Sequence, residues 1–175
     1  MVLEFKVPSG VELSALRPLW TEFLSYVLSF LYIGIYWNNH HHMFAVTERV
    51  NGRILWANMH LLFWLSLIPI TTNWMGVSHF APAPTAVYGA TLLAAAIAYW
   101  LLQSAIIKDQ GSESLLAAAI GTDIKGKISP IIYLTAMIFA FFYPWVAGGL
   151  YTLAALMWLI PDPRIERFME EMPSG

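Results

Sequence analysis

The sequence contains no cysteine and few charged residues. Of its 175 residues, 11% are Asp, Glu, Lys or Arg, whereas about 25% are charged in an ordinary soluble domain. The lack of cysteine excludes disulfides, iron–sulfur clusters and thiolate metal sites. The formal net charge is −2, so the composition does not favour a nucleic acid partner.

The chain instead contains three long stretches without any charged residue, at 23–47, 54–107 and 128–161. A helix needs roughly 20 apolar residues to cross a hydrocarbon core about 30 Å thick, so these stretches leave room for five spans. A water-facing helix would need a polar face, and these stretches have none. The sequence therefore predicts an all-α fold, a polytopic helical membrane bundle in the lipid bilayer, which forms one transmembrane domain.

Proline, glycine and charged segments divide this domain. Pro18 suits the first turn of a helix, and Pro144 and Gly148 interrupt an apolar stretch that is too long for one helix. A polar cytoplasmic loop with a short surface helix is expected at 108–127, and a charged tail at 161–175. The predicted spans are about 19–42, 54–74, 85–107, 128–143 and 145–160.

Basic residues predict the orientation of these spans. Seven of the nine Lys and Arg residues fall in the loop after the first span, in the loop 108–127 and in the tail. Cytoplasmic loops carry an excess of Lys and Arg. The C-terminus is therefore expected in the cytoplasm, and the start of the chain outside.

The densest polar group inside a span is Trp-Asn-Asn-His-His-His at 37–42. A short loop separates it from Asn58 and His60 in the second span, so the two groups are expected at similar depth. Three interpretations remain open. The cluster can join the two spans by hydrogen bonds, it can orient a neighbouring pore helix, or His40–His42 and His60 can bind haem or a metal.

The sequence offers no convincing catalytic arrangement. Glu22 is the only acidic residue within a span, and no serine or threonine has a credible base within reach. We therefore predict no enzyme activity, no catalytic residue, no metal site and no cofactor. Pro69, followed by Thr71 and Thr72, predicts a bend near the outer end of the second span.

Several segments together resemble the bacterial branch of the endosomal/lysosomal potassium channel family, the transmembrane protein 175 family. The most specific is the Trp-x-x-His-x-x-x-Phe pattern formed by Trp37, His40 and Phe44, with Asn58 in the next span. The likeness also includes Leu3–Pro8, Phe23–Tyr26, Gly34–Trp37, Leu67 and Pro69.

This resemblance implies a six-span unit in a homo-oligomer around a pore in the bacterial cell membrane, with potassium as the permeant ion. It assigns Trp37, His40 and Asn58 to a polar network that supports the pore helix, and Asn38 and His41 extend that network. The alternatives are a membrane haem or metal redox protein, or an assembly subunit that does not conduct.

The sequence departs from the family pattern in the pore helix. The family signature Arg-x-x-x-Phe-Ser-Asp does not occur, and Met1–Leu3 resembles only the end of that helix. The pore-lining residues are therefore unknown, because most of the first helix is expected to be missing. Either Met1 is an internal methionine of a longer protein, or the chain is a real truncation.

Overall fold

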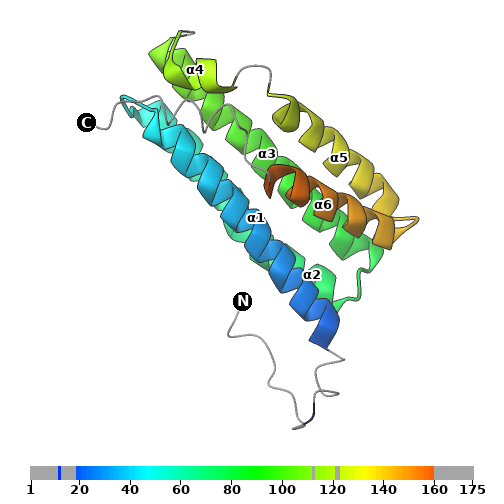
Figure 1. The fold of residues 1–175 in the computed structure, drawn as a ribbon. Coiled ribbons are helices and arrows are strands. Elements are labelled where there is room, and N and C mark those ends of the chain that lie inside the picture. The colour runs from blue at the N-terminus through cyan, green and yellow to red at the C-terminus, as the bar shows by residue number, and fades with distance from the viewer. Residues whose placement is uncertain (1–11, 13–18, 112, 121–122, 160–175) are drawn as a thin grey trace.

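The computed structural model describes residues 12, 19–111, 113–120 and 123–159, and their regular structure is helical (Figure 1). The tail 161–175 and most of the chain before residue 19 lie outside the described residues. The predicted all-α fold is confirmed for the described part. Its six helices are α1 (Trp20–Ala45), α2 (Gly52–Val77), α3 (Pro82–Gln110), α4 (Leu115–Ile120), α5 (Ile124–Ala140) and α6 (Pro144–Leu159).

Side chains cap three of these helices at their N-termini, one of them α4, where the Ser114 hydroxyl accepts a hydrogen bond of 3.4 Å from the backbone N–H of Ala117. The Asn51 side chain accepts a hydrogen bond of 3.1 Å from the backbone N–H of Ile54, and the Asp123 carboxylate accepts one of 3.0 Å from that of Gly126. Each cap satisfies a donor that has no partner within the helix. The Asn51 amide also donates to the carboxylate of Asp109, which holds the start of α2 beside the end of α3.

Fully buried side chains recur every seven residues on α2 and on α3, two helices that pack against each other. A seven-residue spacing returns to nearly the same side of a helix after two turns, so it suits neighbours that are almost parallel or antiparallel. These side chains have 0% exposure: Ile54, Leu61, Ile68 and Met75 on α2, and Tyr88, Ala95 and Leu102 on α3.

The helix α3 is the centre of the bundle. It packs against α2 on one side and against the α5–α6 hairpin on the other. The helix α1 packs against α2 and, more lightly, against α6. In Figure 1 the long helices α1, α2 and α3 run side by side, while α5 and α6 form a shorter hairpin.

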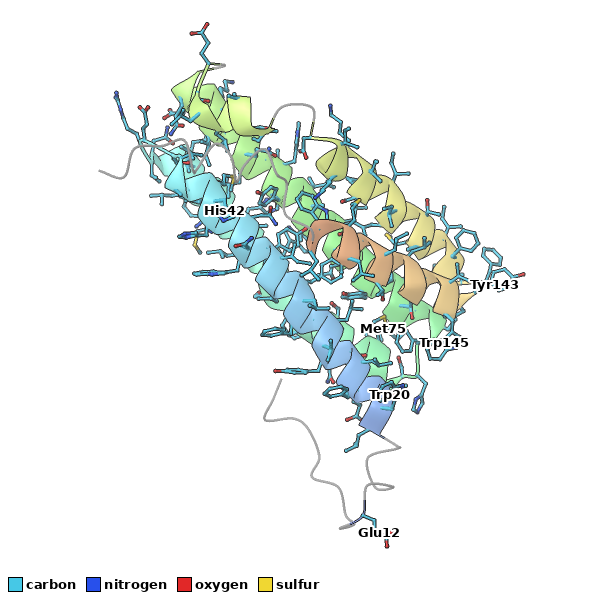
Figure 2. All side chains as sticks on the ribbon, in the orientation of Figure 1. Glu12, Trp20, His42, Met75, Tyr143 and Trp145 are labelled. Carbon is cyan, nitrogen blue, oxygen red and sulfur yellow. The ribbon has the colours of Figure 1, made fainter. Side chains whose placement is uncertain are left out.

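The outer surface of the bundle is apolar and aromatic. On α2, for example, Trp56, Phe63 and Ile70 are exposed by 78%, 56% and 65%. Monomeric soluble proteins rarely expose large contiguous apolar patches. Figure 2 shows Trp20, Tyr143 and Trp145 near the end of the bundle opposite His42, a position that suits aromatic anchors at a membrane interface.

The helices differ in length from the apolar segments of the sequence. The helix α1 continues to Ala45 and α3 to Gln110, while α5 begins at Ile124, inside the predicted loop 108–127. A helix ends where its backbone hydrogen bonds and caps end, and this point need not coincide with the edge of an apolar run. The predicted loop therefore contains the end of α3, the short helix α4 and the first turn of α5.

Candidate functional site

One polar contact joins the ends of α1 and α2. His40 lies near the C-terminal end of α1, Asn58 lies near the N-terminal end of α2, and the connection between them is short. Nε2 of His40 is 2.7 Å from Oδ1 of Asn58, and both side chains are half-buried. Because an amide oxygen can only accept, His40 donates the hydrogen bond from Nε2.

The His40 ring is also held by its own helix. The Phe44 ring lies one turn further along α1, with its centroid 4.7 Å from that of His40 and an interplanar angle of 39°. Residues four apart share a helix face. His40 is therefore fixed by an aromatic neighbour on α1 and an amide on α2.

The other members of the predicted network point elsewhere. Trp37 is 70% exposed, and Asn38 and His41 are also exposed. Of the five predicted residues, the structure thus brings together His40 and Asn58 and places the other three on the outer surface of α1. Their role in supporting a pore stays a prediction.

The remaining histidines do not converge on His40. His60 is exposed and accepts a hydrogen bond of 2.9 Å from Nε1 of Trp64 on the same helix. The His41 and His42 ring centroids lie 6.1 Å apart. Within the part of the chain that the structure describes, no group of three or more His, Asp or Glu residues could hold a metal ion. These described residues therefore provide no ligand set for the haem or metal redox alternative.

Pro69 lies inside α2, which continues past it to Val77. Because proline has no N–H, one carbonyl of the preceding turn has no helical donor at this point. The Thr71 hydroxyl donates to the Leu67 carbonyl at 3.0 Å, and the Thr72 hydroxyl donates to that of Ile68. The predicted helix bend stays a prediction.

A set of buried tyrosines, which was not predicted from the sequence, connects the helices. The Tyr32 hydroxyl on α1 donates to the Tyr151 carbonyl on α6 at 2.6 Å. The Tyr151 hydroxyl in turn donates to the Thr85 carbonyl on α3 at 3.0 Å. The Tyr88 ring packs edge-on against the rings of both tyrosines, at 6.2 and 5.1 Å. These contacts fix α1, α3 and α6 to one another.

The positions of these tyrosines in the sequence could have revealed them. Tyr32, Tyr88 and Tyr151 each lie inside one of the three stretches without charged residues. A hydroxyl in hydrocarbon needs a hydrogen-bond partner. Tyrosines in the middle of an apolar stretch therefore indicate helix contacts.

Comparison with known proteins identifies the family of this chain. A family model described as the endosomal/lysosomal potassium channel TMEM175 matches residues 1–69, which include both His40 and Asn58. A potassium channel of Chryseobacterium sp. is 54% identical over 171 residues, which cover 98% of this chain and 89% of that protein. The chain belongs to the TMEM175 potassium channel family.

Two further relatives are more distant from this TMEM175-family chain. A potassium channel of Streptomyces collinus is 33% identical over 113 residues, which cover 58% of this chain and 53% of the relative. A potassium channel of Chamaesiphon minutus is 28% identical over 170 residues, which cover 89% and 83% of the two chains. No solved structure matches the chain significantly.

The helices agree with membership of the TMEM175 family. Among the described residues, α2 and α3 are long and apolar enough to cross a membrane, and α6 is a shorter apolar helix. Family membership and these helices together identify the chain as an integral membrane protein.

Proposed function

We propose that this chain is a subunit of a potassium channel, which conducts potassium passively as a homo-oligomer in the bacterial cell membrane. The observation that carries the proposal is 54% identity, across 98% of the chain, to a protein named a potassium channel. Potassium is the permeant species in this proposal and no cofactor takes part. The ion would pass an apolar constriction partly dehydrated, without any chemical step.

We propose five membrane crossings, by α1, α2, α3, α5 and α6. The helices α5 and α6 have 17 and 16 residues, so at 1.5 Å per residue each is about 25 Å long. Helices of that length are accommodated by local thinning of the bilayer. Arg53 at the start of α2 and Lys108 at the end of α3 lie at the same end of the bundle, which supports a cytoplasmic C-terminus.

The outer face of α1 supports assembly with another helix. Asn38 and His41 are exposed there beside Trp37, and a polar group without a partner in hydrocarbon costs several kcal/mol as an order of magnitude. We propose that this face contacts a pore-lining helix in the assembled channel. The His40–Asn58 contact would hold α1 in register on α2, so that the face is presented correctly.

Potassium flux from proteoliposomes tests this proposal. The chain starting at Met1 and a form extended by any upstream in-frame residues would be purified and reconstituted separately. Efflux of potassium above that of empty liposomes is expected from the form that assembles. Absence of flux from both forms, each folded and oligomeric, would count against the proposal.

A further inference from the structure

A cavity of about 430 Å³ lies away from the His40–Asn58 contact, between α1, α3, α5 and the end of α6. The helices α1 and α5 approach each other at Tyr32 and Tyr133, whose ring centroids are 6.4 Å apart. The cavity lies beside this contact, and its lining extends along α5 to Asp123 and Lys127 at the start of that helix.

Most of the cavity wall is aromatic or aliphatic. Ile35 on α1, Ile107 on α3 and Trp158 on α6 line it, as does Trp100. Trp100 is also 60% exposed on the apolar outer surface of α3. The wall therefore continues onto the surface that faces lipid. The volume lies within the range of about 300–1,000 Å³ that is usual for sites of small molecules.

One buried polar side chain in this wall has no hydrogen-bond partner among the described residues. Gln103 lines the cavity, is 7% exposed, and forms no hydrogen bond with any other residue that the structure describes. A glutamine amide offers two N–H donors and an oxygen acceptor, and leaving them unpaired in a buried site is unfavourable. Tyr99 lies one turn away from Gln103 on α3. Unlike the Gln103 amide, the Tyr99 hydroxyl has a partner, because it donates to the Asn39 carbonyl at 3.4 Å. The Gln103 amide is available to a ligand.

The two ends of the cavity differ in charge. Lys127 is exposed and Asp123 is half-buried at one end, whereas the other end is formed by Tyr32 and Tyr133 among apolar helices. Part of the Asp123 carboxylate is already used in capping α5 at Gly126. Among the described residues, Lys127 is the one basic side chain that lines the cavity. A ligand with an apolar body and an anionic head matches this distribution.

We propose that the cavity binds the acyl chain of a membrane lipid, with an ester or carboxylate oxygen accepting from the Gln103 amide and the anionic end of the lipid directed toward Lys127. In the proposed topology this lipid belongs to the cytoplasmic leaflet. Water alone fits poorly, because each ordered water needs two to four polar partners and the wall is mostly apolar. A phospholipid and a free fatty acid share this chemistry. Lipid binding in this cavity requires a bilayer but not conduction of potassium. Absence of lipid binding would therefore leave the channel proposal unaffected.

Photolabelling with a diazirine-bearing palmitic acid tests the site in the full-length protein. After illumination in detergent, labelled peptides are mapped by mass spectrometry. Label is expected to concentrate in peptides covering 96–107 and 124–133, several-fold above 55–63 on α2, a helix that does not line the cavity. Ser104→Trp, which fills the cavity, is expected to remove this excess several-fold. Ala90→Trp, at an exposed position on the same helix, is expected to leave it unchanged. Equal labelling of all three segments, or an excess that survives Ser104→Trp, overturns the proposal.

A second variant covers the case in which Ser104→Trp fails to fold. Gln103→Leu keeps the volume of the side chain and removes its hydrogen bonds, so it is expected to lower the excess label severalfold while the protein still elutes as a single species. Unchanged labelling of Gln103→Leu overturns the assigned role of the amide. Native mass spectrometry of the wild-type protein then identifies the source, because the adduct has the mass of either a phospholipid or a fatty acid. An adduct that is neither overturns the proposal.

Discussion

Nε2 of His40 and Oδ1 of Asn58 lie 2.7 Å apart across an otherwise largely apolar contact between α1 and α2. At the opposite end of this helix pair the contact is steric, because a Cβ added at Gly76 would lie 2.8 Å from Cβ of Ser25. The pair is thus fixed by the His40–Asn58 hydrogen bond at one end and by the close approach of Ser25 and Gly76 at the other, where Oγ1 of Thr21 also lies 3.5 Å from Nδ1 of His79.

Replacing Asn58 with leucine tests the directional bond. Asn58→Leu leaves the His40 N–H without its acceptor, so we expect a loss of about 1–2 kcal/mol in the free energy of unfolding. Thermal unfolding in detergent would measure it. The double variant His40→Leu/Asn58→Leu should recover part of the loss, since neither polar group then remains unpaired. Additive losses in the double variant would show that the two side chains are not coupled.

The exposed polar face of α1 should matter for assembly more than for folding. We expect Asn38→Leu/His41→Leu to reduce the oligomer fraction in size-exclusion chromatography with light scattering, because these polar groups would lose their proposed partners. The melting temperature of the dissociated subunit should hardly change. Ser66→Leu provides a control, because Ser66 is exposed on α2 and donates only to its own helix at Phe63. Equal oligomer fractions in all variants would contradict the assignment.

Close approach of α3 and α6 makes Gly89 sensitive to any side chain. A Cβ at Gly89 would lie 2.9 Å from Cζ of Tyr151 and 2.7 Å from Cγ of Met137, so Gly89→Ala should cost about 1–3 kcal/mol through overpacking. Gly149→Ala is the matched control, because nothing lies within 4 Å of its added Cβ. It should be neutral or stabilise α6 by up to about 1 kcal/mol. Denaturant unfolding would rank the two variants, and similar values for both would refute the packing argument.

The absence of cysteine allows a direct test of topology. We expect a single cysteine introduced as His79→Cys, in the exposed turn between α2 and α3, to react with a membrane-impermeant maleimide in intact cells. Glu113→Cys, in the exposed connection between α3 and α4, should react only after permeabilisation. The two positions lie at opposite ends of α3, which should place them on opposite faces of the membrane. Labelling of both in intact cells would contradict the proposed crossings.

The sequence was sufficient to predict a helical fold and a similar depth for His40 and Asn58. Long uncharged runs are enough to locate helices such as α2 and α3, and the short connection between α1 and α2 is enough to bring His40 and Asn58 to similar depth. The spacing of residues on one helix does not determine which face meets a neighbour. Trp37 and His41 share a face with each other, yet that face lies outward.

The buried tyrosines and the cavity could not be predicted in the same way. All faces of a membrane helix are apolar, so hydrophobic periodicity does not distinguish the buried face from the one that meets lipid. The Tyr151–Thr85 contact joins residues 66 apart in the sequence, and the cavity beside Gln103 is lined by residues of several helices. The tyrosine contact and the cavity both follow from tertiary packing, which the spacing of residues along one helix does not determine.

Current across a planar lipid bilayer measures the central claim most directly. The purified oligomer would be incorporated between solutions with a tenfold potassium gradient, and the reversal potential recorded. A channel of the proposed kind predicts single-channel steps whose reversal potential moves toward the potassium equilibrium potential and follows it when the gradient is inverted. A folded, oligomeric protein that gives no current, or currents that ignore the potassium gradient, would contradict the claim.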